Sequence, residues 1–146
     1  MAVQQTVSGS VTFLLGKLGG IATALFAKRL AATGLKPRHC AVLELASSME
    51  LSQLELANRI GVTASVVVDM LDELEDLGAV RRVAQAGDRR RRVVKLTETG
   101  RELREQAARA AHEVDAELLR DLDARSQTML RSALAQVGST YGLSYR

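Results

Sequence analysis

Residues 52–78 combine the sequence signals of two helices joined by a tight turn. Ser52 and Glu55 have the S-x-x-E spacing of a capping box, in which each side chain bonds a free backbone N–H of the first helical turn. Gly61 stands where the chain needs a positive φ, and Gly78 suits the left-handed cap that ends a helix. Apolar residues recur at three- and four-residue steps on both sides of Gly61. The segment therefore predicts a helix-turn-helix.

An arginine-rich β-hairpin is predicted directly after these helices. Residues 80–83 and 92–96 read as two short strands joined by a polar loop that contains Gly87 and Asp88. The helix spacing alone also fits a plain helical hairpin within a core. A helix pair followed by a two-stranded ribbon, however, is the layout of a winged helix, in which one helix enters the DNA major groove and the wing reaches beside it. The hairpin therefore favours DNA binding.

Long amphipathic helices are predicted on both sides of this lobe. One apolar stripe runs over residues 11–30, and two more run over residues 103–118 and 129–137, with Asp123 placed to cap the last helix. The lobe between these helices is too small to cover all the stripes, which predicts a homodimer. The expected fold is one domain over residues 1–146, mainly α with a small β-hairpin. It has a winged helix-turn-helix lobe at 35–97 and dimerisation helices at 8–34 and 98–140.

Charge is distributed unevenly along the chain, although the net charge is only +3. Residues 81–104 contain nine basic and three acidic residues, which suits a nucleic-acid partner. Residues 63–80, in contrast, contain five acidic residues and no basic one. These acids are expected to form a solvated face or to pair with arginines of the wing.

Several other classes of protein are not expected from this sequence. The single cysteine excludes an intrachain disulfide, and no charged leader precedes a long apolar run, so we expect a cytoplasmic protein. Glycines and Lys17 interrupt the most apolar region, which argues against a membrane span. No G-x-S-x-G, P-loop, H-E-x-x-H or C-x-x-C spacing occurs, so we expect no enzyme and no cofactor. His39 and His112 are too isolated to predict a metal site.

Four segments together resemble the multiple antibiotic resistance regulator (MarR) family, and they span most of the chain. They read LKPRHCAVL, LSQLELANRIGVTAS, LEDLGAVRR and DRRRRVVKLTETG. The most specific element is Asp88 with Arg90, followed by V-x-L-T-x-x-G that ends at Gly100. The resemblance implies an obligate dimer built from the first and last helices, a palindromic operator, and in many members a small ligand that alters DNA affinity.

Base contacts are expected from the outward residues at the start of the second helix of the pair, which are Thr63, Ser65, Val66, Val68 and Asp69. The two hydroxyls can bond phosphates or bases, and the valines suit a thymine methyl group. Thr63 has an equal alternative role as an N-cap. Members of the family commonly have a hydroxyl residue and an arginine at the positions of Val68 and Asp69, so this chain departs from the pattern there. Asp69 is able to accept a hydrogen bond from a cytosine amino group.

The wing carries the run Arg89, Arg90, Arg91 and Arg92, whose side chains should alternate between two faces of the ribbon. The resemblance implies that Arg90 enters the minor groove and that Asp88 orients it. The other arginines are expected to neutralise phosphates or to pair with the acidic helix. A solvated surface is the alternative for any run of charges, but its place after a helix-turn-helix favours DNA.

Two residues of the preceding helix are candidates for regulation. The family resemblance places His39 near a ligand pocket between the dimerisation helices and the lobe. Cys40 would make the chain a thiol-based redox sensor, although a lone cysteine in an apolar pattern is usually a small buried residue. A second alternative is a winged-helix module that docks on a protein, to which the acidic helix would be suited. We predict a sequence-specific repressor that binds double-stranded DNA as a homodimer and responds to a small-molecule effector.

Overall fold

The helix-turn-helix forms as the sequence predicts in the computed structural model, which describes residues 6–143. Helix α3 (Gln53–Ile60) begins at the capping box, where Ser52 N donates to Glu55 Oε2 at 2.9 Å and Glu55 N donates to Ser52 Oγ at 3.3 Å. Gly61 turns the chain with a φ of 81°, and α4 (Ala64–Asp76) follows. Gly78, with a φ of 72°, lies just after α4, so both glycine predictions are confirmed.

The hairpin forms a two-stranded antiparallel ribbon with longer strands than predicted. Strand β1 (Val80–Gln85) pairs with β2 (Asp88–Leu96) in a register that places Val80 opposite Leu96 and Ala84 opposite Arg92. The arginine run therefore lies within β2 rather than in a loop. Val94 N also donates to Leu51 O at 2.9 Å, which ties the ribbon to the segment before α3.

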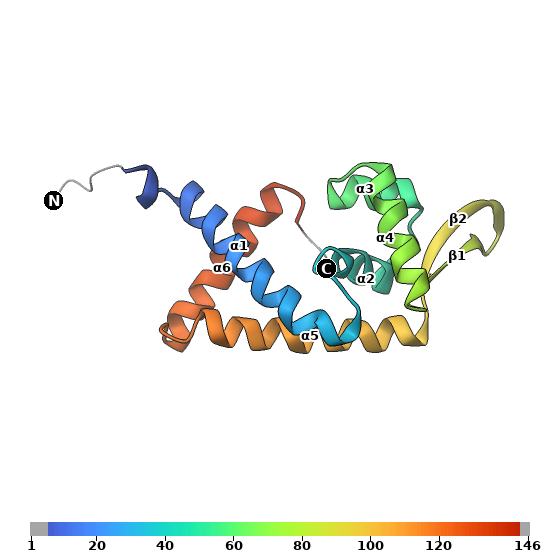
Figure 1. The fold of residues 1–146 in the computed structure, drawn as a ribbon. Coiled ribbons are helices and arrows are strands. Elements are labelled where there is room, and N and C mark those ends of the chain that lie inside the picture. The colour runs from blue at the N-terminus through green and yellow to red at the C-terminus, as the bar shows by residue number, and fades with distance from the viewer. Residues whose placement is uncertain (1–5, 144–146) are drawn as a thin grey trace.

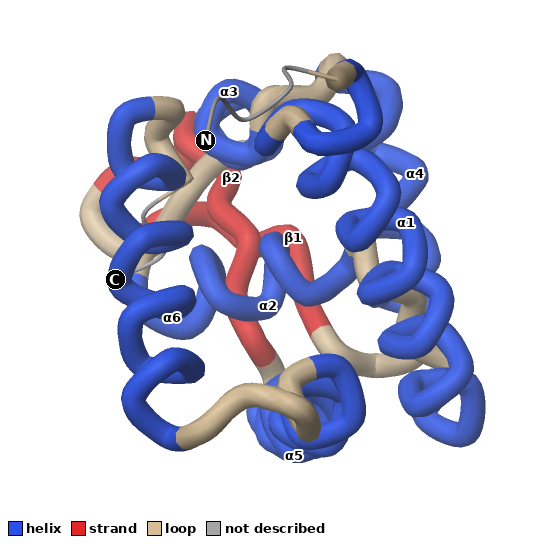
Figure 2. Tube along the Cα trace, turned by 90° about the vertical axis from the view of Figure 1, so that its left-hand side faces the viewer, coloured by secondary structure: helices blue, strands red, loops and turns tan. Residues whose placement is uncertain are grey.

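The remaining helices frame this lobe. The chain begins with η1 (Val7–Gly9), α1 (Val11–Leu30) and η2 (Ala31–Thr33), then enters the lobe through α2 (His39–Ser48). After β2, the long α5 (Glu98–Leu118) runs away from the lobe, and α6 (Ala124–Thr140) turns back (Figure 1). Asp123 caps α6 by accepting from Ser126 N at 2.7 Å, as predicted. Figure 2 shows α1 and α6 on opposite sides above α5. The predicted fold class is confirmed, while the proposed domain bounds stay a prediction.

The core lies in the lobe and along the first part of α5. Most of its fully buried side chains come from α2, α3, α4 and the wing, with Leu30 from the end of α1, and α5 adds Leu103, Ala107 and Ala110. Gly100 is buried where α5 begins, and a Cβ placed on it would lie 2.0 Å from Ala79 O. Only glycine allows α5 to approach the start of the wing this closely, which explains the glycine of the V-x-L-T-x-x-G pattern.

Helices α1 and α6 have almost no buried surface within the chain. Leu30 is the one buried residue of α1, and no described residue of α6 is buried. Their exposed apolar side chains are Val11, Phe13, Leu14, Leu15, Leu18, Ile21, Met129, Leu130, Leu134 and Val137. A monomer rarely leaves apolar surface of this extent in water, so these helices need a partner.

The glycines and Lys17 of α1 do not make this helix too short or too polar to span a membrane, contrary to the expectation from the sequence. Residues Val11–Thr33 form a 23-residue helical segment with a mean hydropathy of 1.4, which is long and apolar enough to cross a bilayer. None of its most apolar window is buried in the described chain. A face of this kind suits either a bilayer or another protein chain.

Candidate nucleic-acid interface

The first turn of α4 presents small side chains to the surface. Thr63, Ser65, Val66 and Asp69 are exposed, whereas Val68 is half-buried. Thr63 Oγ1 accepts from Val66 N at 3.4 Å and lies 3.1 Å from Ser65 Oγ. Thr63 is therefore an N-cap, and its hydroxyl still lies at the surface beside that of Ser65. Contact between this turn and DNA bases stays a prediction.

Arg89 and Arg90 are the exposed, uncommitted arginines of β2. Neither side chain has a salt bridge or a hydrogen bond to any residue between 6 and 143. Asp88 Oδ1 accepts from Arg90 N at 3.1 Å, so the acid orients the backbone of Arg90 rather than its guanidinium. These two cations are therefore available to a phosphate backbone or a minor groove.

Arg91 and Arg92 are instead bonded to the protein. Arg91 Nη2 donates to Glu55 Oε2 at 2.7 Å, and Arg92 Nη2 donates to Arg82 O at 2.8 Å. The acceptor Glu55 is also the capping-box residue of α3, and both Arg91 and the backbone N–H of Ser52 lower its pKa. The run therefore divides into two consecutive pairs and not by the expected alternation, because the strand register shifts between Ala84, opposite Arg92, and Gln85, opposite Asp88. Arg91 also pairs with α3 and not with the acidic face of α4.

Arg82 of β1 pairs with the acidic face of α4, which is the pairing with wing arginines that the sequence offered as one of two alternatives, although the sequence did not single out this residue. Its guanidinium holds Glu75 through two bonds of 2.9 and 2.8 Å, bonds Asp72, and donates to Gln53 Oε1 at 2.9 Å. The hydrogen bond from Arg82 lowers the pKa of Glu75. The signal was present in the sequence, because Asp72 and Glu75 are three residues apart on one helix face that the wing follows directly.

His39 is buried, and both of its ring nitrogens are used within the lobe. Lys36 N donates to Nδ1 at 3.0 Å, so the ring proton lies on Nε2, which donates to Glu73 Oε2 at 2.6 Å. Burial lowers the pKa of His39 despite the adjacent carboxylate, which keeps the imidazole neutral at pH 7. Lys36 and Arg38 also pair with Glu73, so the segment before α2 is fastened to the middle of α4.

Cys40 is half-buried beside His39, and its surroundings disfavour the thiolate. Burial, assisted by the negative charge of Glu44, raises the pKa of Cys40 to about 11. Because the thiolate is the form that oxidants attack, this environment argues against the redox-sensor alternative. Within residues 6–143, no three acidic, histidine or cysteine side chains are placed to hold a metal ion.

A cavity of about 540 Å³ lies between α1 and the segment before α2. Small residues of α1, including Gly19, Gly20 and Ala24, form one wall, and Lys36 and Arg38 lie on the other. His39 does not line it. The cavity therefore combines an apolar wall with two cations, and both cations pair with Glu73 of α4.

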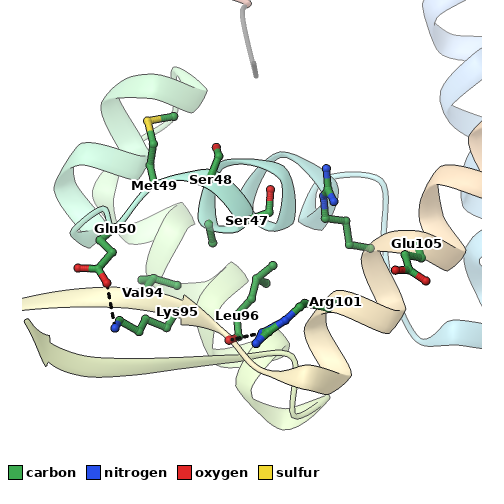
Figure 3. A pocket seen from close by; sticks show the side chains of 11 residues that line it. Ser47, Ser48, Met49, Glu50, Val94, Lys95, Leu96, Arg101 and Glu105 are labelled. Atoms are coloured by element: carbon green, nitrogen blue, oxygen red, sulfur yellow. Dashed lines mark hydrogen bonds and ion pairs between the residues drawn. The ribbon is translucent and has the colours of Figure 1, made fainter.

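A second cavity of about 490 Å³ lies between the end of α2, β2 and the start of α5. Its charged residues largely neutralise one another, because Lys95 pairs with Glu50 at 2.9 Å and Arg104 bonds Glu44 at 2.9 and 3.0 Å. Arg101 is directed at Leu96 O at 3.5 Å (Figure 3). This cavity offers a ligand few uncommitted polar groups.

The helix-turn-helix, the exposed first turn of its second helix and the two uncommitted wing arginines define a winged-helix DNA-binding protein. The MarR family model matches residues 33–91. The transcriptional repressor Rv2887 of Mycobacterium tuberculosis is 32% identical over 128 residues, which are 87% of this chain and 92% of that protein. The chain belongs to the MarR family and is a DNA-binding transcription regulator, which confirms the prediction that it is not an enzyme.

Solved structures agree with this assignment over nearly the whole chain. CouR from Rhodococcus jostii, bound to p-coumaroyl-CoA, is 30% identical with a TM-score of 0.77, covering 91% of this chain and 94% of that one. Rv2887 in complex with DNA is 28% identical with a TM-score of 0.75, covering 89% and 98%. Rv2887 has also been solved with salicylic acid, at 30% identity and a TM-score of 0.71, covering 89% and 97%.

Proposed function

We propose that the protein is a cytoplasmic repressor that binds a palindromic operator as a homodimer. The first turn of α4 enters the major groove through Thr63, Ser65 and Val66, and Arg90 enters the adjacent minor groove while Arg89 binds phosphate. The observation that carries this proposal is the division of the arginine run, which leaves Arg89 and Arg90 exposed and without a side-chain bond to residues 6–143, while the first turn of α4 is exposed as well. Repression is the activity by which the relative Rv2887 is named.

The dimer is built from α1 and α6. Both helices expose an apolar stripe that the chain itself does not cover, and a second copy would bury the stripes of both molecules. A Cβ on Gly16, Gly19 or Gly20 would meet nothing within 4 Å inside the chain. Close approach by a partner helix therefore accounts for Gly16 better than packing within one subunit does, whereas Gly19 and Gly20 line the cavity beside Lys36. A dimer interface also explains the apolar face of α1 without a bilayer.

Replacing Arg90 with alanine is expected to weaken operator binding by about 1 to 3 kcal/mol, because a cation in the minor groove is lost. The measurement is a fluorescence-anisotropy titration at fixed salt, using duplex DNA from upstream of the protein's own gene. Arg120→Ala is the control, since it removes an equal charge from an exposed residue at the far end of α5. Equal affinities for the wild type and Arg90→Ala would show that Arg90 does not contact DNA.

Ligand response is the second part of the proposal, and the cavity between α1 and Lys36 supports it. An organic anion there would compete with Glu73 for Lys36 and Arg38. Its binding would therefore weaken the ion pairs between the segment before α2 and α4. Relatives that bind salicylic acid and p-coumaroyl-CoA support a ligand with an apolar body and an anionic group.

Salicylate is therefore expected to weaken DNA binding by the wild type, by about 1 to 3 kcal/mol at saturation. Ala24→Phe, which fills the cavity from α1, should bind DNA normally and lose the response. The measurement is a DNA titration of both proteins at increasing salicylate and constant ionic strength. A wild-type affinity that salicylate leaves unchanged would contradict this ligand chemistry while leaving the DNA-binding proposal intact.

A further inference from the structure

Arg82 joins three elements of the DNA-binding lobe through one guanidinium. It lies on β1, holds Asp72 and Glu75 of α4, and reaches Gln53 in the first turn of α3. Its side chain is 23% exposed, and all three of its nitrogens donate. A planar donor group that is bonded at three nitrogens fixes the direction of each partner more strictly than a single ion pair does.

Within residues 6–143, the other polar attachments of the wing reach α3 and the segment before it, and not α4. Arg91 bonds Glu55 of α3, and Lys95 pairs with Glu50 in the segment before α3. Val94 N bonds Leu51 O in the same segment. Among the described residues, Arg82 makes the side-chain ion pairs that connect the wing to α4. Val80 and Val94 of the wing also share the apolar core with Leu71 and Leu74 of α4, and Arg82 adds to this packing the directional bonds that orient the wing on α4.

We propose that Arg82 is a positioning residue that holds the wing and α4 in one orientation for DNA binding, so that Asp72 and Glu75 strengthen DNA binding through it. This inference rests on the proposed docking of α4 and the wing on DNA. It accounts for acids in a DNA-reading helix, where their charge alone would oppose binding. Arg82 needs no contact with DNA, because its hydrogen-bonding groups are occupied by protein.

The direction of the effect separates this proposal from simple electrostatics. Removing a negative charge near DNA should raise affinity if charge alone matters. Asp72→Asn combined with Glu75→Gln removes two negative charges but also weakens the hold on Arg82, so we expect affinity to fall by about tenfold. Asp76→Asn is the matched control, since Asp76 is an exposed acid on the same helix with no salt bridge within residues 6–143. That variant should bind DNA as tightly as the wild type or more tightly.

The experiment measures DNA affinity and amide hydrogen exchange for the full-length wild type, the double variant, Arg82→Met and Asp76→Asn. DNA titrations use the duplex from upstream of the gene at several salt concentrations. Hydrogen exchange on the free proteins reports whether β1 and β2 open more often when the Arg82 contacts are lost. In the double variant and Arg82→Met, we expect exchange in the wing to be about tenfold faster, with α2 and α5 unchanged.

Each outcome of these measurements supports or overturns the positioning role of Arg82. Weaker binding by the double variant with faster exchange confined to the wing and α4 supports the positioning role. Tighter binding by the double variant, parallel to Asp76→Asn, overturns it in favour of charge alone. Unchanged exchange in the wing also overturns it, even if Arg82→Met binds DNA poorly. If the wild type itself does not bind the duplex, the proposed operator fails, and the exchange measurement still decides the role of Arg82.

Discussion

Replacing Gly100 with alanine is expected to lower the free energy of unfolding by more than about 2 kcal/mol. The added Cβ would lie 2.0 Å from Ala79 O and 3.0 Å from Leu96 Cδ2. Ala79 O is a backbone atom, so side-chain rotation cannot relieve this clash. Ala79 O already accepts from Thr97 N at 3.0 Å, and Thr97 also bonds Gly78 O, so the start of α5 is held against the end of α4. Alanine would gain about 1 kcal/mol in helix propensity, which is too little to offset the displacement.

The measurement is urea-induced unfolding of both proteins at one protein concentration, because dimerisation makes apparent stability depend on concentration. Thr99→Ala, an exposed substitution on the preceding residue, should change the unfolding free energy by less than about 0.5 kcal/mol. A Gly100→Ala protein as stable as the wild type would mean that α5 moves away from Ala79 without cost. In that case Gly100 would not fix the junction between the wing and the dimerisation helix.

The helix-turn-helix was predictable because its signals are local. A capping box, a positive-φ glycine and helical spacing lie within one stretch of chain, and each depends on neighbours three or four residues away. The length of the two wing strands was harder to predict from the sequence. Consecutive arginines have no apolar alternation, so the sequence places them at a loop. In the structure β2 continues through them, with a shift of register between Ala84, opposite Arg92, and Gln85, opposite Asp88.

Side-chain partners were the least predictable part of the candidate site. The four arginines are chemically identical, and the course of β2 decides that Arg91 meets Glu55 while Arg89 and Arg90 have no side-chain bond to residues 6–143. The same limit applies to the buried His39, because its hydrogen-bond partner Glu73 lies 34 residues further along the chain. Contacts between distant segments depend on how whole elements pack, and one sequence contains no direct signal for them.

The acidic residues of α4 illustrate how charge in a sequence differs from charge at a surface. Glu73 forms ion pairs with Lys36 and Arg38. Asp72 and Glu75 form ion pairs with Arg82. These pairs leave Asp69 and Asp76 as the exposed acids of α4 without a salt bridge among the described residues. The helix that should repel DNA therefore has much of its charge compensated before DNA arrives.

A charged substitution on α6, Leu134→Glu, is expected to convert the dimer into a monomer and to reduce operator affinity by at least about a hundredfold. Leu134 is 46% exposed in the single chain, so a carboxylate there costs the monomer little. In the proposed dimer it would be buried without a partner, and a monomer loses the second half-site, about 34 Å away along the DNA. Light scattering after gel filtration gives the oligomeric state, and anisotropy gives the affinity.

Ser132→Glu provides the control on the same helix. Ser132 is exposed, and a two-residue offset places it on the side of α6 opposite to Leu134. It introduces the same charge outside the apolar stripe, so the protein should remain a dimer and keep its DNA affinity. A dimeric Leu134→Glu protein that binds DNA normally would show that α6 does not form the interface, and the exposed stripes of α1 and α6 would then require a different partner.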